Sequence, residues 1–543
     1  MPSSQLSKIS KRTLLILLIL LIGFISLGIY GWSRTFKDAG ADPTYLESAM
    51  QSVEMITSDR TLIFNATYSK HWTVLVSFFG IKAVLIYTFF YSALFFLRRK
   101  MAVWNFRKER GHTVIVGSNE ETKKLVGHYL NKGNALALIG EDNNDSDYQS
   151  LEDQGVLVIL GNPEDEKLLK KVQLARAAKV IVATHNESKN VNVAEKVSSC
   201  VKNNNEISGK IEVLVRVESD KLRNVLEKRW KVFESTECVF RIINFQSTAI
   251  REVISEIAID LCGEAKIRKQ GPRFLIVADS SLSDHLLRQA IIFVQVSGES
   301  VPLFTIPNED AGIESYFRST YPDIDLVADV NYVECSKNRI ANSEKFAGQS
   351  FDAVIVCMDN ELETMGLTYE LLDSNSINID KGYAILRESQ KMEMTHDERL
   401  KIMLLTDYGL KSPEFGDSDM EKEAEDNHNA YLSGLSEEKR SVAKEWRQLD
   451  YATKEANRLA VLHRKVKLKI QEITGDENEE EMISLLACSE HQRWKAEKIF
   501  SGWIGGPVRD NKRKIHDNIC PYSELSDEIK GYDVTQVRKA LGL

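Results

Sequence analysis

Long apolar runs are confined to the first hundred residues, and the rest of the chain alternates short apolar stretches with amphipathic ones. The first run, Leu14–Trp32, is uncharged, and the second, Trp72–Leu97, carries one internal charge, Lys82. At about 1.5 Å per residue, either run is long enough as a helix to cross a hydrocarbon core of about 30 Å. No small-residue cleavage pattern follows Trp32, so an uncleaved span is favoured over a signal peptide.

Basic residues cluster on the outer flank of each run: Lys8, Lys11, Arg12, Arg98, Arg99 and Lys100. The positive-inside rule therefore predicts a multi-pass protein of the inner or plasma membrane with both termini in the cytoplasm. Residues 1–110 form this membrane part. An ionisable group such as Lys82 within a span usually faces a partner, a pore or the interface.

The segment that connects the two runs predicts a helix over residues 44–56, followed by Thr57, Ser58 and Asp59. Two-span potassium channels use a comparable stretch for a re-entrant helix and a glycine-containing carbonyl filter. No glycine occurs between Ala41 and Gly80, so that filter is absent. A surface helix outside the membrane and a non-standard pore loop remain alternatives. The candidate pore or membrane residues are Thr57, Ser58, Asp59 and Lys82.

From His112 onward, apolar strands alternate with amphipathic helices. Strands are predicted at 112–117, 135–139, 156–160, 180–184 and 213–217. This alternation of strands and helices is typical of a parallel α/β sheet covered on both faces. We therefore predict a Rossmann-like domain over residues 111–264. Ligands bind such sheets beyond the carboxyl ends of the strands. The candidate ligand-binding residues at those ends are Gly117, Ser118, Glu141, Asp142, Gly161, Asn162, Thr184 and Asn186.

The turn after the first strand departs from the GxGxxG dinucleotide fingerprint. Asn119 stands where the second glycine would let the backbone approach a pyrophosphate, and Glu120 and Glu121 would repel phosphate at the helix start. Glu141 is placed to bond a ribose hydroxyl. A Rossmann domain that binds a ligand and one that is purely structural are both compatible with this pattern.

The order of these pieces resembles the RCK (TrkA-N) domain, the regulator of potassium conductance. The resemblance covers about residues 112–260, including a helix over 247–259 that is similar to the crossover helix of that family, and it rests on the segments Val114–Gly117, Leu160–Asp165 and Ala177–Thr184 and on Asn190. It implies a homo-oligomeric ring, with a tetramer favoured, that binds nucleotides or ions and pulls on pore helices.

Residues 265–400 show the same alternation of strands and helices. A helix is predicted at 285–296, and strands are predicted at 273–277, 301–306, 323–327, 352–356 and 382–386. We interpret this part as a degenerate second RCK-like domain. Its first turn has no glycine, which favours a scaffold over a ligand-binding domain. Residues 401–440 are polar and acidic and predict a solvated linker.

Residues 441–543 are mainly helical and contain Glu490-His491-Gln492-Arg493-Trp494, Gly502-Trp503, His516, Pro521-Tyr522 and Lys530-Gly531-Tyr532-Asp533. This order resembles the ryanodine-receptor (RyR) repeat, except that Asp517 follows His516 where the family has proline. Aromatic faces could stack on a base and arginines could hold phosphates; the alternative is that the rings simply form a small core. The candidate ligand-binding residues are Trp446, Asp450, Arg458, His491, Arg493, Trp494, Trp503 and Tyr522.

Composition narrows the function. A net charge of −9 argues against a nucleic-acid partner. Seven single cysteines, all after the apolar runs, suit a reducing compartment and form no zinc motif. No acid–base or nucleophile constellation indicates an enzyme, and no cofactor is certain beyond a possible nucleotide ligand. We therefore expect a ligand-gated, cation-channel-like membrane protein; the alternative is a non-conducting, membrane-tethered sensor that signals to a protein partner.

Overall fold

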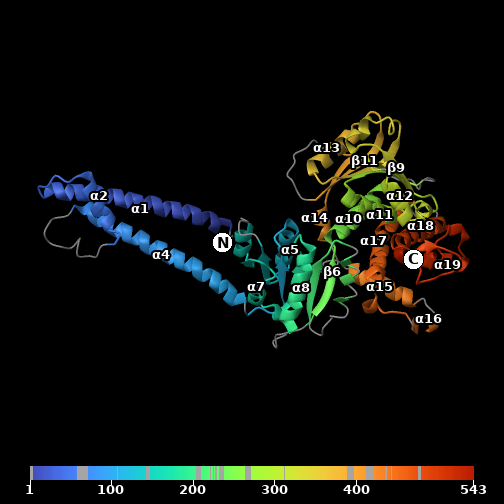
Figure 1. The fold of residues 1–543 in the computed structure, drawn as a ribbon, viewed down its shortest axis with the longest axis horizontal. Coiled ribbons are helices and arrows are strands. Elements are labelled where there is room, and N and C mark those ends of the chain that lie inside the picture. The colour runs from blue at the N-terminus through green and yellow to red at the C-terminus, as the bar shows by residue number, and fades with distance from the viewer. Residues whose placement is uncertain are drawn as a thin grey trace. The chain divides into compact units, whose positions relative to one another are not determined.

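The computed structural model shows two compact units, Met1–Ile242 and Ile243–Leu543, and each is described by itself (Figure 1). The structure describes residues 4–57, 71–106, 108–141, 147–202, 210–219, 222–223, 225–226, 229–230, 238–262, 271–310, 312–387, 397–410, 420–433, 437–441, 443–449, 451–474 and 479–543.

The described residues of the first unit begin with the helices α1 (Ser4–Asp38), α2 (Tyr45–Glu54) and α4 (Trp72–Phe106). Within α1 and α4, the segments Leu15–Asp38 and Trp72–Tyr91 are long and apolar enough to cross a membrane. Only 17% and 33% of the residues in their most apolar windows are buried, whereas the core helix of a soluble protein would be mostly buried. The two predicted spans therefore exist as apolar helices that expose most of their surface.

The predicted helix between the two runs is confirmed as α2. Thr44 is its N-cap and forms a capping box with Glu47, in which each side chain accepts a hydrogen bond from the backbone N–H of the other residue. Thr57 follows α2 in the described chain, whereas the candidate pore residues Ser58 and Asp59 lie outside the described residues.

The rest of the first unit is a Rossmann-like domain with the strand order β3-β2-β1-β4-β5-β6, and the pairs β1–β2, β2–β3, β1–β4 and β4–β5 are parallel. This order is that of the dinucleotide-binding folds, with the switch point between β1 and β4. Strand β6 was not predicted. The elements are β1 (His112–Val116), α5 (Glu120–Asn131), β2 (Leu136–Gly140), α6 (Asp147–Asp153), β3 (Leu157–Leu160), α7 (Glu166–Lys171), η1 (Leu174–Arg176), β4 (Ala177–Val182), α8 (Glu187–Lys202), β5 (Ile211–Arg216) and β6 (Cys238–Ile243).

The second unit contains a second complete Rossmann-like sheet, with the order β12-β11-β10-β7-β8-β9 and parallel pairing throughout. Read from β7, this is the same topology, with the switch point between β7 and β10. Its elements are α10 (Phe245–Cys262), β7 (Arg273–Ala278), α11 (Ser280–Phe293), β8 (Leu303–Asn308), α12 (Gly312–Thr320), η2 (Ile324–Leu326), β9 (Asp329–Glu334), η3 (Lys337–Asn342), β10 (Ser350–Cys357), α13 (Glu361–Leu372), β11 (Asn378–Leu386), β12 (Leu400–Leu404) and α14 (Leu405–Gly409).

Two predicted segments in this unit differ from the structure. The strand predicted at 323–327 is a 3-10 turn, and the third strand begins at Asp329. The predicted linker over 401–440 contains the end of β12, all of α14, the helix α15 (Met420–Ser433) and the short helix α16 (Glu437–Ser441). In α15, Met420, Ala424 and His428 are buried at a spacing of four residues, so its acidic side chains occupy the other face of a packed helix.

The crossover-like helix α10 packs with the second unit rather than with the first domain, to which the sequence assigned it. Its apolar side chains join the core around α11, and its carboxylates accept hydrogen bonds from tyrosines of the second sheet region: Tyr383 donates to Asp260 and Tyr408 donates to Glu256, both at 2.7 Å. Both the apolar side chains and these two carboxylates of α10 therefore make their described contacts within the second unit.

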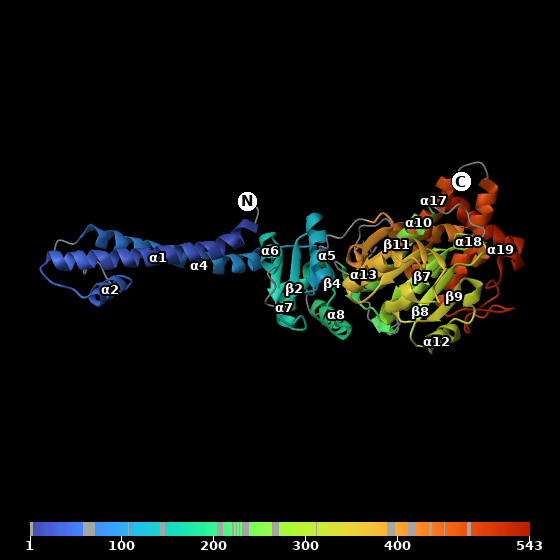
Figure 2. The same ribbon diagram turned by 90° about the horizontal axis from the view of Figure 1, so that it is seen from above.

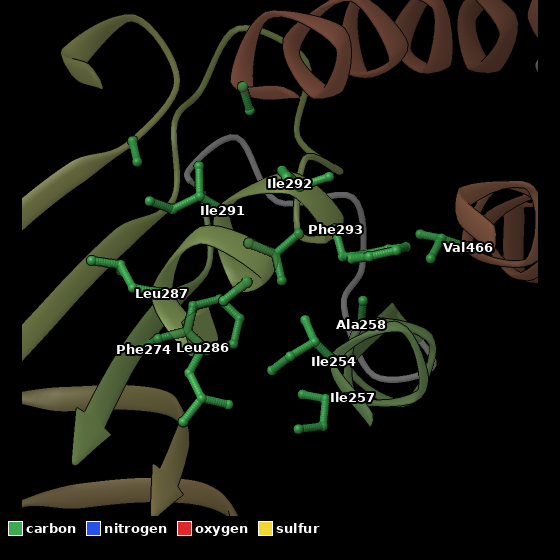
Figure 3. Close-up of a cluster of buried hydrophobic side chains, with 14 of the residues drawn as sticks. Ile254, Ile257, Ala258, Phe274, Leu286, Leu287, Ile291, Ile292, Phe293 and Val466 are labelled. Carbon is green, nitrogen blue, oxygen red and sulfur yellow. The ribbon is translucent and has the colours of Figure 1, made fainter. Parts of the chain in front are cut away.

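The C-terminal part consists of η5 (Trp446–Gln448), α17 (Tyr451–Thr474), α18 (Glu479–Phe500), β13 (Ile504–Gly505), β14 (Ile515–His516), η7 (Tyr522–Glu524) and α19 (Asp527–Leu541). In both views it lies against the second sheet region (Figure 2). The two share one hydrophobic core, in which Val466 of α17 lies beside Phe293 of α11 and Ala258 of α10 (Figure 3). The C-terminal helices are therefore part of the second unit and do not form a separately tethered module.

Candidate functional site

The switch point of the first sheet is closed by a side chain of the chain itself. Asn119, which is buried, caps α5 by accepting from Thr122 N at 2.8 Å and donates Nδ2–H to Ala183 O at 2.9 Å, so it bridges the ends of β1 and β4. A Cβ on Gly117, whose φ is +148°, would lie 2.6 Å from Thr122 Cγ2 and 2.8 Å from Ala183 O. The place where a pyrophosphate would approach the backbone is thus occupied.

The acidic residues around this point are paired within the domain. Glu121 accepts from Arg216 Nη1 at 2.8 Å, and Glu141 lies 2.8 Å from Lys189 Nζ. The carboxylate that would bond a ribose therefore holds a lysine of α8. The pair of Glu121 with Arg216, together with that of Glu120 with Lys123 at 2.9 Å, offsets the negative charge that the sequence places at the start of α5.

The remaining predicted residues at this edge are held in two local networks. Asn190 accepts from Thr184 N at 2.9 Å and donates to Thr184 O at 3.0 Å, while Thr184 Oγ1 contacts the backbone O of Asn186. Asn162 is exposed and accepts from Glu164 N. Ser118 is half-buried, Gly161 ends β3 with φ +146°, and Asp142 lies outside the described residues.

The switch point of the second sheet carries a similar internal bridge. Asp279, at the end of β7, accepts from the backbone N–H of Asp359 and pairs with Lys337 Nζ at 3.1 Å, and Arg387 pairs with Asp359. Asn360 caps α13 through its side-chain oxygen. Because an aspartate rather than a glycine closes the β7–β10 crevice, this arrangement favours the scaffold interpretation of the second domain.

An aromatic cluster forms the most distinctive site of the C-terminal part. The rings of Trp494 and His516 are 5.0 Å apart and edge-on, Trp494 and His491 are 5.3 Å apart, Trp503 and His516 5.8 Å, and His491 and Tyr522 5.7 Å. Trp494, Trp503 and Tyr522 are half-buried: they pack against the shared core and also expose ring surface. We call these five residues the ring cluster.

The buried His491 orients the ring cluster. It lies 3.1 Å from Asp533 through Nδ1 and 3.1 Å from Asn518 O through Nε2, so both ring nitrogens have acceptor partners. Two ammonium groups lie beside the half-buried rings: Lys498 Nζ is 6.0 Å from the centre of the Trp494 ring, and Lys530 Nζ is 5.7 Å from that of Tyr522. Aromatic faces beside cations can stack on a base and hold a phosphate.

Arg493 has different surroundings from its neighbour Trp494. It is 3% exposed and donates to Glu490 Oε1 through Nε and Nη2, at 3.1 and 2.9 Å, and to Glu497 Oε2 at 3.1 Å. Burial opposes the charge of Glu490, but Arg493 and Lys467 hold the pKa of this carboxyl well below its usual range. Arg493 is therefore held by two carboxylates. Glu497 also pairs with Lys498 at 3.3 Å, and Lys530 donates to Ser523 O at 3.3 Å, so these two lysines are anchored beside the rings.

The predicted residues on the preceding helical segment belong to other contacts. Trp446 is buried with Ala424 and Leu449 against α15, and Arg458 pairs with Glu455, which also binds Arg251 of α10. Among the contacts that the structure describes, none joins Trp446 or Arg458 to the ring cluster. Asp450 lies outside the described residues.

In the N-terminal helical part, α2 buries two serines. Ser48 and Ser52 are buried against α1 and α4, where a Cβ on Gly28 would lie 3.0 Å from Ser52 Oγ. The exposed side of α2 carries the large apolar residues Tyr45, Leu46, Met50 and Val53 together with the acids Glu47 and Glu54. Small and hydroxyl residues at a helix interface are typical of helices that pack within lipid.

Lys82 has a defined partner. Its Nζ donates to Ile56 O at 2.9 Å, just beyond the C-terminal end of α2, where helix carbonyls lack intrahelical partners. Ile56 and Met55 pack with Phe78 and Ile81 of α4. The carbonyl end of α2 therefore lies beside the middle of the apolar segment of α4.

The far end of α4 enters the first Rossmann-like domain. Phe106, the last residue of the helix, is buried in the core of that domain, and its ring is edge-on to His112 at 4.7 Å. A single 35-residue helix thus links the apolar segment at Trp72 to the first strand of the sheet. Sequence reasoning placed Asn119 in the path of a pyrophosphate, but it did not anticipate the bond of Asn119 to Ala183 O or the positions of Lys498 and Lys530 beside the rings.

Two domain families match the chain. Residues 113–233 match the TrkA-N domain and residues 467–543 match the RyR domain, so both predicted resemblances are confirmed. No curated protein sequence matches the chain.

Three of the similar solved structures are forms of one channel. The GsuK channel is 15% identical, with 74% of this chain and 96% of that chain covered at a TM-score of 0.34. GsuK bound to ADP is 15% identical, with 74% of this chain and 96% of that chain covered at a TM-score of 0.33. The GsuK channel bound to NAD is 13% identical, with 71% of this chain and 79% of that chain covered at a TM-score of 0.30. These values are too low for the ligands of those structures to be assigned to this chain.

Proposed function

We propose that this chain is a subunit of a ligand-gated, cation-channel-like membrane protein with both termini in the cytoplasm. The observation that carries the proposal is α4, which is unbroken from its apolar segment to the core of the TrkA-N domain. A continuous helix transmits displacement along its axis because bending it breaks backbone hydrogen bonds. A shift of the domain would therefore move the apolar segment.

The packing of α2 supports a re-entrant helix over a surface helix. Its exposed apolar residues, Tyr45, Leu46, Met50 and Val53, would be costly in water but suit lipid or a neighbouring subunit. Its C-terminal carbonyls carry a partial negative charge, which favours a nearby cation. A pore from two spans per chain requires several chains, and we propose a homo-oligomer with a tetramer favoured.

The ring cluster is the proposed sensor, and a nucleotide is the proposed ligand class. Its half-buried rings offer stacking surface, and Lys498 and Lys530 supply cations for a phosphate. The bridged switch points make either Rossmann-like crevice a poorer candidate for a dinucleotide. The proposal requires no catalytic residue.

The experiment is conductance of the purified chain in planar bilayers with a panel of mono-, di- and cyclic nucleotides. The double variant Lys498→Gln/Lys530→Gln should bind the active nucleotide at least about tenfold more weakly, because each lysine supplies a charge-assisted contact. The control Lys469→Gln removes a lysine of α17 that pairs only with Glu472 among the described residues, and should leave the response unchanged. Equal responses of the double variant and the control would refute the sensor.

A second candidate is a non-conducting, membrane-tethered sensor. The missing glycine between Ala41 and Gly80 favours it, because a carbonyl filter ordinarily needs one. Nucleotide binding by the reconstituted protein with no conductance at any nucleotide concentration would support this candidate and refute the channel.

A further inference from the structure

A cavity in the C-terminal part lies apart from the ring cluster. It has a volume of about 150 Å³, opens to solvent and is lined by residues of α15, α17, α18 and α19. No ring-cluster residue lines it. The lining residues that carry charge are Glu423, Asp426, Arg464, Lys467, Glu490 and Lys539.

The wall of this cavity contains a buried ion pair. Lys467 and Glu490 are 3% and 7% exposed, and Lys467 Nζ donates to Glu490 Oε2. An ammonium group has three N–H donors. In the described part of the chain Glu490 is the hydrogen-bond partner of this ammonium, so donor capacity remains at the cavity wall. Burial lowers the pKa of Lys467, against the attraction of Glu490.

The charges of the rim are separated by element. Glu423 and Asp426 come from α15, whereas Arg464 comes from α17 and Lys539 from α19. Arg464 is positioned by its Nε–H bond to Ala540 O at 2.7 Å. Two acids thus face the cavity from one helix and two cations from the others.

We propose that this cavity binds a small zwitterion that carries one amine and one carboxylate. The acids of α15 receive the ammonium, and Lys467, Arg464 and Lys539 receive the carboxylate. The buried Glu490 is already paired with Lys467 and Arg493, and the four exposed rim charges, two acids and two bases, sum to zero. Such a rim does not offset the charge of a nucleotide, but it matches a neutral ligand with two opposite charges. The volume is also below the roughly 300 Å³ at which pockets for larger ligands begin.

The test is calorimetric titration of the detergent-solubilised full chain with glycine, β-alanine, 4-aminobutanoate and 5-aminopentanoate. Propionate and propylamine, which carry one charge each, are the matched probes. We expect at least one amino carboxylate to bind at least about tenfold more tightly than both single-charge probes, because only it satisfies both sides of the cavity.

Two exposed rim residues locate the site without disturbing the buried pair. Asp426→Asn and Lys539→Gln should each weaken the best probe at least about tenfold. Glu425→Gln and Lys465→Gln change neighbours outside the lining and should bind as the wild type does. The proposal is overturned if no amino carboxylate binds, if propionate binds equally well, or if the two rim variants retain wild-type affinity. None of these readouts involves nucleotide or conductance, so the outcome is independent of the ring cluster.

Discussion

Replacing Glu490 by glutamine tests whether the buried charge network holds the C-terminal helices together. Glu490 is 7% exposed and accepts from Lys467 through Oε2 and from Arg493 through Oε1. In Glu490→Gln, Arg493 keeps Glu497 at 3.1 Å, but Lys467 loses the carboxylate charge that the structure describes opposite it and retains at most a neutral amide oxygen as acceptor. Removing one member of a buried ion pair costs about 3–5 kcal/mol because the other charge stays buried and uncompensated.

The matched control is Glu472→Gln in the same helical part. Glu472 pairs with Lys469 at 2.9 Å, but its side chain is 68% exposed. Solvent screens such a pair, and its loss should cost about 0–1 kcal/mol. The same substitution of a lysine-paired glutamate is therefore expected to have very different effects at the two positions.

Hydrogen exchange of the detergent-solubilised chain is the appropriate assay, because a multidomain protein does not unfold in one step. For Glu490→Gln, a loss of about 3–5 kcal/mol corresponds to exchange in α17 and α18 that is about a hundredfold to a few thousandfold faster. Adding Lys467→Met should restore part of the protection against exchange, because it removes the uncompensated ammonium charge of Lys467. Equal exchange in Glu490→Gln and Glu472→Gln would refute the reasoning.

Three further predictions concern other parts of the chain. Because the pKa of Glu490 is lowered in the folded state, its contribution to stability is present above pH about 4.3 and is lost as pH falls below that, so the acid dependence of exchange should be shallower in Glu490→Gln. Gly117→Ala should destabilise the first domain by more than about 1 kcal/mol in thermal unfolding, whereas Gly127→Ala, at an open helical position, should stabilise it by about 0.5–1 kcal/mol. Lys82→Met should lower the unfolding temperature in detergent through a loss of about 1–3 kcal/mol at Ile56 O, while Lys82→Arg should retain most of the stability.

The elements that were predictable from sequence are those whose pattern is local. The apolar strands β1 to β5, β7, β8, β10 and β11 were predicted because period and length indicate them, and so was the helix after Thr44. Strand β9 was misplaced, and β12 was assigned to the linker. Strand β6 (Cys238–Ile243) was missed because its buried positions are neither continuous nor alternating, so neighbours in the sheet decide its state. The acidic α15 was read as a linker because Met420, Ala424 and His428 form too narrow a buried stripe to outweigh its charges.

In the candidate sites, too, local patterns were predictable from sequence and contacts between distant segments were not. The motif between His491 and Tyr522 pointed to the ring cluster because all five of its residues lie in this one stretch of sequence. The partners that define each site come from distant segments, and spacing does not reveal them. Glu490 and Lys467 lie on different helices, and Arg493 is buried while its neighbour Trp494 is half-buried because successive helical residues point about 100° apart.

The shared core limits how a ligand at the ring cluster could act on the rest of the second unit. Separating the C-terminal helices from α10 and α11 would expose Phe293, Val466 and their neighbours, at about 1.5–3 kcal/mol for each large side chain. It would also break the contact between Arg251 of α10 and Glu455, whose pKa is lowered by Arg251 and Arg458 in spite of burial. A ligand that binds two states differently by a few kcal/mol cannot offset that loss. A ligand response at the proposed sensor would therefore require the core between the C-terminal helices, α10 and α11 to stay intact, with any displacement small enough to keep these contacts.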